Sequence, residues 1–186
     1  REPLAVSGRL ARGLRRGDAT PRLGEAVLVL TLATHPALLA RHLDDFLHLE
    51  LGHRELEGLR RAVVDCCGAE PEMPAEALAE RLSAAGFGPL LDRLKRQVAA
   101  SGAWQALPDS ADSDADEGWR QALILHRRAR ALHKELKEAE AALASDGTAE
   151  NLRRLIEIQN QLSNAEGIEA AIDGFGQPSG RQSQNY

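Results

Sequence analysis

Three aspartates at alternating positions are the residues whose spacing most suggests metal chemistry. Asp112, Asp114 and Asp116 alternate with Ser113 and Ala115, and alternating carboxylates recur in magnesium and calcium sites. A calcium loop also needs a glycine turn and a distal glutamate at fixed offsets, and neither follows here. All three aspartates open a predicted long helix, whose dipole stabilises negative charge at that end. We therefore interpret them as helix-capping residues, with a metal site as the alternative.

The six histidines show no spacing typical of a metal site or a catalytic base. His126 and His133 share a helix face, but two helical turns separate them too widely to chelate one ion at bond lengths of about 2 Å. His42 and His48 have no suitable spacing either. His35 directly precedes a proline and has no acid–base partner nearby in the sequence, so we interpret it as a helix-entry residue.

The two cysteines are adjacent, so they predict neither a disulfide framework nor a zinc site. Cys66 and Cys67 end an apolar helix without an activating neighbour, and we expect them to be buried free thiols of a cytoplasmic protein. No nucleophile motif, phosphate-binding loop or dinucleotide fingerprint is present. The sequence of this chain therefore predicts no catalytic residue, no metal and no cofactor.

The composition favours helices and a partner other than nucleic acid. Aromatic residues make up 3% of the chain, while Leu, Ala, Arg and Glu dominate, and these residues suit helices better than sheets. With a net charge of −5, we do not expect direct nucleic-acid binding to dominate. The longest apolar stretch, from Ala26 to Ala40, is broken by polar residues and a proline and is too short to span a membrane.

Five short helices are predicted within a bundle at residues 20–103. The first begins at Thr20-Pro21 and is apolar on nearly all sides, so we place it at the centre of the bundle. The others are expected at 35–51, 53–67, 75–85 and 89–100, separated by Gly and Pro. Residues 1–19 interleave arginines with glycines and predict a flexible basic linker, with an arm that touches nucleic acid as the alternative.

Residues 109–165 predict a long connecting helix and a C-terminal antiparallel helical hairpin. One helical pattern runs from Ser113 to Ser145, about 50 Å at 1.5 Å per residue, so it must project beyond the bundle. We expect Trp119, Leu123 and Ile124 to anchor its beginning on the bundle. Its later apolar positions alternate three and four apart, as in paired helices; these are Ala122, Leu125, Ala129, Leu132, Leu136, Ala139 and Leu143.

The last helix is predicted to fold back after a turn at Asp146-Gly147, with Thr148 as its cap. Its pairing positions are expected to be Leu152, Leu155, Gln159 and Leu162. The polar composition from Glu166 onward predicts a mostly disordered tail at 166–186.

Apolar residues on the last helix cover more of its surface than one neighbouring helix can bury. They span an arc of about 160°, against roughly 100° for an ordinary surface helix. The surplus, with Ile156 and Ile158 at its edges, is a candidate partner surface, and the alternative is that the hairpin folds back on the bundle. The candidate binding residues are Leu136, Leu143, Leu152, Leu155, Ile156, Ile158, Gln159 and Leu162.

Several stretches of the sequence resemble the C-terminal domain of bacterial DNA primases. In the bundle these are Gly24–Leu39, Phe46–Leu51 and Arg54–Asp65; in the second half they are Leu132–Leu143 and Leu152–Leu162. The resemblance rests on order and pattern rather than on an invariant motif.

This resemblance implies a non-catalytic, all-helical docking domain. In that family the terminal hairpin docks on the N-terminal domains of the hexameric replicative helicase, and the bundle modulates the helicase. In some relatives basic residues of this domain also bind single-stranded-DNA-binding protein. The resemblance implies that the chain acts at the replication fork in the cytoplasm.

The parent enzyme of the family is a DNA primase, a DNA-directed RNA polymerase that synthesises RNA primers with zinc and magnesium. Its zinc-binding and polymerase domains have no counterpart in these 186 residues, and the chain begins at Arg1 without Met, so we interpret it as a separated piece. The alternatives are a generic helical adaptor of another assembly and a metal-dependent enzyme that uses Asp112, Asp114 and Asp116.

Overall fold

A computed structural model describes residues 21–174 of the chain, and the side chains of residues 21–164. The predicted linker at 1–19 and the last part of the predicted tail, residues 175–186, lie outside the described residues. Within the described range the chain forms seven α-helices, two short 3-10 helices and no strand. The predicted all-helical class is therefore confirmed.

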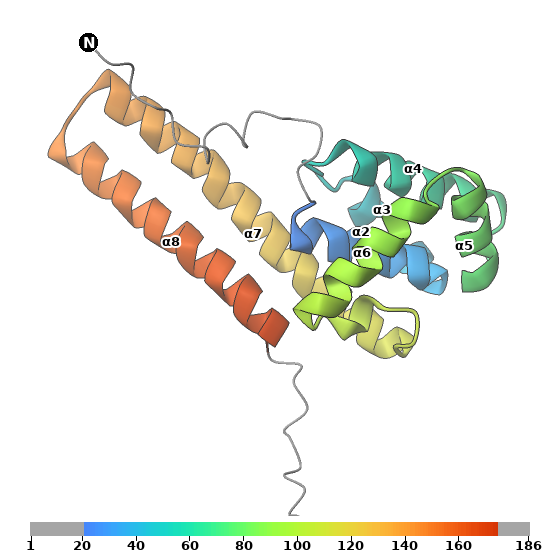
Figure 1. Ribbon diagram of the computed structural model, residues 1–186. Helices are drawn as coiled ribbons and strands as arrows, with labels where there is room; N and C mark the ends of the chain where they lie inside the picture. Colours follow the sequence, from blue (N-terminus) through green and yellow to red (C-terminus); the bar gives the residue numbers. More distant parts are fainter. Residues whose placement is uncertain (1–20, 175–186) are drawn as a thin grey trace, which may run out of the picture.

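The helices follow one another with short connections (Figure 1). The α-helices are α2 (Leu23–Thr34), α3 (Leu39–Leu47), α4 (Arg54–Ala69), α5 (Ala75–Ala84), α6 (Gly88–Ser101), α7 (Asp112–Ser145) and α8 (Ala149–Gly174). The 3-10 helices are η1 (Pro36–Leu38) and η2 (Trp104–Ala106).

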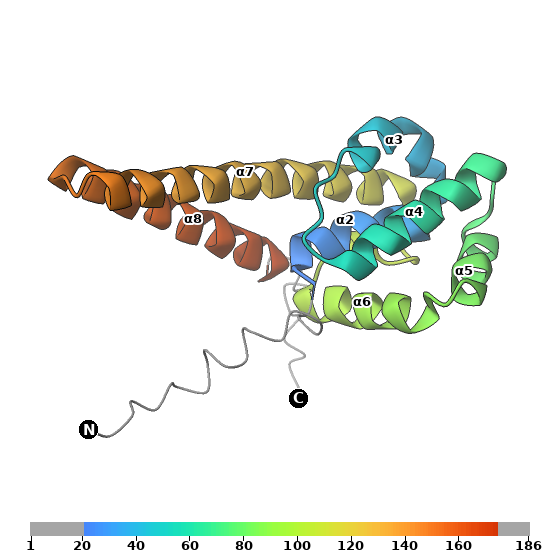
Figure 2. The ribbon, with the colours of Figure 1, turned by 90° about the horizontal axis from the view of Figure 1, so that it is seen from above.

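Helix α2 lies at the centre of the bundle, where it contacts α4, α5, α6 and α7 (Figures 1 and 2). Its surface is apolar on nearly all sides, and Leu28, Leu30 and Leu32 are fully buried. The buried hydroxyl of Thr34 donates to the carbonyl oxygen of Leu30 over 2.9 Å. Because polar groups in this core find partners within the helix, α2 can be buried without the cost of unsatisfied donors.

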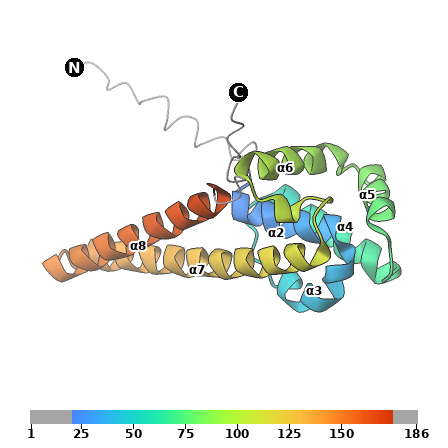
Figure 3. The same ribbon diagram turned by 90° about the horizontal axis from the view of Figure 1, so that it is seen from below.

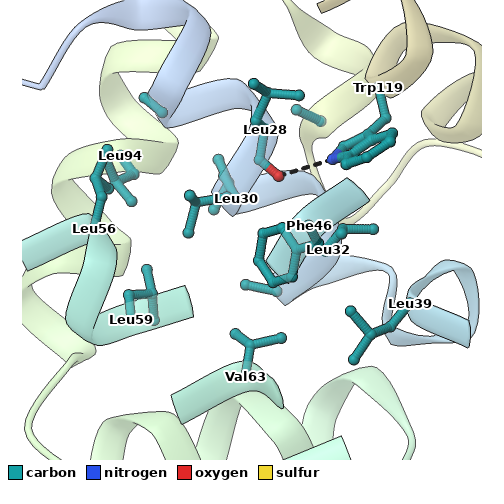
Figure 4. Close-up of a cluster of buried hydrophobic side chains, with 14 of the residues drawn as sticks. Leu28, Leu30, Leu32, Leu39, Phe46, Leu56, Leu59, Val63, Leu94 and Trp119 are labelled. Carbon is teal, nitrogen blue, oxygen red and sulfur yellow. Dashed lines mark hydrogen bonds between the residues drawn. The ribbon is translucent and has the colours of Figure 1, made fainter. Parts of the chain in front are cut away.

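The first part of α7 completes the core of the bundle (Figure 4). Ala115, Trp119 and Leu123 are buried there, as expected for the last two. The expectation for Ile124 is wrong, because its side chain is 66% exposed. Successive residues of a helix are about 100° apart, so Ile124 points away from the face that Leu123 buries.

Helix α7 continues past the bundle, and α8 runs back beside it in the opposite direction (Figures 2 and 3). Thr148 caps α8 as predicted, since its Oγ1 accepts a hydrogen bond of 3.2 Å from the backbone N–H of Asn151. The side-chain amide of Asn151 donates to the carbonyl oxygens of Ala142 and Asp146, over 3.3 and 2.8 Å. These bonds fix how α8 is rotated about its axis next to α7.

Three predicted boundaries are wrong. Helix α2 begins at Leu23 rather than Pro21, and the Pro21 carbonyl accepts a hydrogen bond of 2.8 Å from the side chain of Gln97. The second predicted helix ends at Leu47 instead of Leu51, because the Arg60 guanidinium donates to carbonyl oxygens at its C-terminal end, including that of Leu47.

The third correction concerns the predicted tail, because α8 continues through residues 166–174. The stretch after Glu166 contains no proline before Gly174, and its alanines, glutamate and isoleucines can propagate a helix that is already formed.

No single helix among residues 21–174 has both the length and the apolarity to cross a membrane. The two consecutive segments Leu23–Thr34 and Pro36–Leu47 meet that test only when joined, and the chain bends by 99° between them.

Candidate functional site

The outer face of α8 carries exposed apolar side chains. Leu152 and Ile156 are 48% and 47% exposed, and Gln159 is exposed beside them. Their spacing of four and three residues places them on one side of the helix. We call Leu152, Ile156 and Gln159 the outer face of α8. Two half-exposed apolar side chains one turn apart form a small apolar surface on this side of α8.

The other candidate residues lie elsewhere in the α7–α8 pair. Leu136, Leu143, Leu155 and Leu162 are half-buried. The expectation that Ile158 lies at the edge of an open surface is wrong, because only 5% of its side chain is exposed.

The pairing positions predicted for α8 are corrected in the same way. The buried or half-buried positions are Asn151, Leu155, Ile158 and Leu162, so Leu152 and Gln159 do not take part. Both sets keep the spacing of paired helices. The hydrogen bonds of Asn151 to Ala142 and Asp146 are compatible only with the observed set, in which that side chain faces α7.

Asp116 is the centre of a buried charged cluster between α3 and α7. Its carboxylate accepts hydrogen bonds from His42, from Arg120 and, over 2.9 Å, from Arg41. The ring of His42 packs on that of Trp119 with 4.3 Å between their centroids. Burial alone would raise the pKa of Asp116, but the bonds from His42 and Arg120 and the charges of Arg120 and Arg41 together lower it.

The capping interpretation holds only in its electrostatic part and only for two of the three aspartates, because no side chain forms a capping hydrogen bond at the start of α7. Asp112 and Asp114 lie in the first turn of α7, where the helix dipole favours negative charge. For Asp116 it is wrong, because this buried side chain pairs with cations of α3 and α7. Across the part of the chain that the structure describes, no group of three or more His, Cys, Asp or Glu side chains could hold a metal ion.

His35 has an acidic partner that the sequence did not reveal. Its Nδ1 lies 2.9 Å from the Oδ1 of Asp112, and its Nε2 lies 3.1 Å from the Oγ of Ser110 and 3.0 Å from the carbonyl oxygen of Leu107. This order resembles a Ser–His–Asp arrangement. However, the Ser110 hydroxyl donates to the carbonyl oxygen of Gln105 over 2.6 Å.

The Ser110 hydroxyl is thus directed at the carbonyl oxygens of Gln105 and Leu107 rather than at a base, so the arrangement does not activate Ser110 as a nucleophile. The arrangement joins the corner between α2 and η1 to the first turn of α7.

The two cysteines lie at the end of α4. Cys67 is buried and Cys66 is partly buried, as expected for free thiols packed beside a core. Burial, with the neighbouring Cys66 as a smaller cause, raises the pKa of the Cys67 thiol. A raised pKa keeps the thiol protonated, which makes it a weaker nucleophile at neutral pH.

A basic groove of about 820 Å³ lies where α7 leaves the bundle. It is formed by the start of α2, the loop before α4 and the middle of α7, and its charged lining residues are Arg22, Glu25, Glu50, Arg130, Lys134 and Lys137. None of these charged residues was predicted from the sequence to belong to a site. The dense basic stretch at 126–137 was visible, but its proximity to Arg22 depends on the packing of α7 beside α2.

Comparisons with protein families, with characterised proteins and with solved structures found no match to this chain.

Proposed function

We propose that this chain is the helicase-docking domain of a bacterial DNA primase, in which it acts as a non-catalytic module at the replication fork. Two features support the proposal. The first is the resemblance of Gly24–Leu162 to that domain, in which we equate α2–α6 with the bundle and α7–α8 with the connecting helix and hairpin. The second is the outer face of α8, which exposes Leu152 and Ile156 on a helix pair that extends away from the bundle.

The geometry suits a rigid connection between a partner and the rest of the primase. Helix α7 is continuous for 34 residues, about 51 Å at 1.5 Å per residue. Trp119 fixes its first part in the core through a hydrogen bond to Leu28. A helicase domain held on the outer face of α8 would therefore keep a defined position relative to the bundle.

The chemistry of such docking is burial of apolar surface. Leu152 and Ile156 would leave water on binding, and apolar area removed from water stabilises a complex by about 25 cal/mol per Å². Gln159 next to them can donate and accept hydrogen bonds at the rim of the contact. Docking at the helicase would place primer synthesis, by the parent's polymerase domain, where the duplex has just been opened.

The proposal is tested by measuring the affinity of the purified chain for a bacterial replicative helicase. The double variant Leu152→Arg/Ile156→Arg should weaken binding by at least about 100-fold, because two charges would be buried without partners. Far-UV circular dichroism should not change, since both side chains are half-exposed in the free chain.

Ile124→Arg is the control for an added arginine, because it places one such charge at another exposed isoleucine of this chain. It should bind as the unmodified chain does. If the helicase does not bind the unmodified chain at all, the proposal fails and the generic adaptor takes its place. Equal affinity of the double variant and the unmodified chain would remove the outer face of α8 from the contact.

A further inference from the structure

The basic groove has more positive than negative side chains, and two of its lysines are unpaired. Arg130, Lys134 and Lys137 lie four and three residues apart, so they share one face of α7, and Arg22 adds a fourth cation from the start of α2. Among the described residues neither Lys134 nor Lys137 forms an ion pair, and both are exposed.

The two carboxylates of the groove already have partners. Glu25 is buried and accepts hydrogen bonds of 3.0 and 3.1 Å from the backbone N–H of Gly52. Glu50 pairs with Arg130. The lining therefore has four cationic side chains against two carboxylates, and Arg22, Lys134 and Lys137 are the cations that form no ion pair among the described residues.

From this arrangement we propose that the groove binds the phosphodiester backbone of a single-stranded nucleic acid. The cations on α7 extend over about 10 Å along the helix axis, at 1.5 Å per residue, which is enough for contacts to several consecutive phosphates. The net charge of the whole chain is negative, but binding responds to the local field of a groove as well as to net charge.

The lining differs from that of a groove that binds the apolar side chains of a peptide. Pro21 and Ala131 are its only apolar side chains among the described residues, so it offers no pocket for an apolar peptide side chain. No Phe, Tyr or Trp lines it either, so bases have no such ring on which to stack. Binding should therefore be independent of base sequence and strongly dependent on salt.

The test uses the whole chain and a fluorescent oligothymidylate longer than about 16 nucleotides, the upper site size of one single-strand-binding OB fold. Fluorescence anisotropy over a series of salt concentrations gives the slope of log K against log[salt]. In Lys134→Ala/Lys137→Ala the magnitude of that slope should fall by about 1.4, because each lost phosphate contact removes about 0.7. No helicase is present, so the result is independent of the proposed docking function.

Arg153→Ala/Arg154→Ala is the matched control, since it removes the same charge from exposed positions of α8 outside the groove. It should keep the slope of the unmodified chain, and circular dichroism should show that both variants fold. No binding at the lowest salt, or equal loss in both variants, would overturn the proposal. So would binding of an oligoglutamate peptide, but not of the oligonucleotide, with the same dependence on the two lysines.

Discussion

The indole Nε1 of Trp119 donates a hydrogen bond of 3.0 Å to the backbone carbonyl oxygen of Leu28 (Figure 4). Trp119 belongs to α7 and Leu28 to α2, and both side chains are almost completely buried. The long helix is therefore part of the core of the bundle at its beginning, although most of its length lies outside. Bundle stability and the direction of the α7–α8 pair consequently depend on the same contact.

Truncation of Trp119 should destabilise the whole bundle. Trp119→Ala should lower the free energy of unfolding by about 3–5 kcal/mol, the usual cost of deleting a buried aromatic side chain. Trp119→Phe keeps a ring but loses the hydrogen bond, so the cost should be about 1–2 kcal/mol. Urea unfolding followed by circular dichroism measures both values.

Trp104 provides the control for this prediction, because its side chain is 45% exposed. Trp104→Phe should change the free energy of unfolding by no more than about 0.5 kcal/mol. Equal effects at the two tryptophans would contradict the core position of Trp119.

Asp116 should make stability fall in acid. The pKa of Asp116 is lower in the folded chain than in the unfolded chain. The stabilisation by its carboxylate is therefore complete above the unfolded pKa of about 3.9, and it is lost as the pH falls through the lower pKa of the folded chain. Asp116→Asn leaves the buried His42 without its carboxylate, which should cost about 3 kcal/mol at neutral pH. Urea unfolding should show that the difference in free energy of unfolding between the unmodified chain and Asp116→Asn becomes smaller as the pH falls below about 4. A difference that stays constant with pH would argue against a charged Asp116 as the cause.

His126 should make the free energy of unfolding depend on pH at higher pH values than Asp116 does. Its ring is buried near the carbonyl oxygen of Glu50, which lies 3.1 Å from Nε2. Burial lowers the pKa of His126, and the opposing effects of the Glu25 charge and the Glu50 bond are smaller. The stability that goes with a neutral, buried His126 is therefore complete above the unfolded pKa of about 6.5, and it is lost as the pH falls through and below that pKa.

The variant His126→Gln removes this titration and keeps an N–H group that can donate to Glu50. The free energy of unfolding should then differ less between about pH 7 and about pH 5 than in the unmodified chain. His48→Gln changes a histidine whose side chain is exposed and should leave the difference as it was. A pH dependence unchanged in His126→Gln would show that burial of this ring has no energetic consequence.

The helices were predictable because their signals are local. Gly and Pro separate the apolar runs, so the order of α2 to α8 follows from the sequence alone. The end of α3 was not predictable in this way. It depends on Arg60, a residue of α4 whose guanidinium reaches the carbonyl oxygens of Phe46, Leu47 and Leu49.

The polar clusters depend on contacts between residues far apart in the chain. His42 and Asp116 are separated by 74 residues and His35 and Asp112 by 77, and no spacing rule relates such pairs. The basic groove could not be predicted from the sequence for the same reason, because Arg22 and Lys134 line one groove only when α7 packs beside α2. Periodicity predicts which face of a helix is apolar, whereas the partner of a polar side chain requires the packed structure.

The rotation of α8 was ambiguous because two sets of positions satisfy the same spacing. Leu152 with Gln159 and Asn151 with Ile158 both fit a helix pair that also uses Leu155. The structure has the second set, in which Ile158 lies inside and Asn151 donates to the carbonyl oxygens of Ala142 and Asp146.

Ile158→Arg should consequently disrupt the α7–α8 pair itself, not only a partner surface. Burying a guanidinium at a position that is 5% exposed should cost at least about 3 kcal/mol. The pair has one apolar contact surface and little other support, so far-UV circular dichroism should show loss of helix and a lower melting temperature. Tryptophan fluorescence should remain that of a folded bundle, because Trp119 lies in a separate core. Leu152→Arg, on the outer face of the same helix, should leave all three signals unchanged, and the same result for Ile158→Arg would disprove the observed rotation of α8.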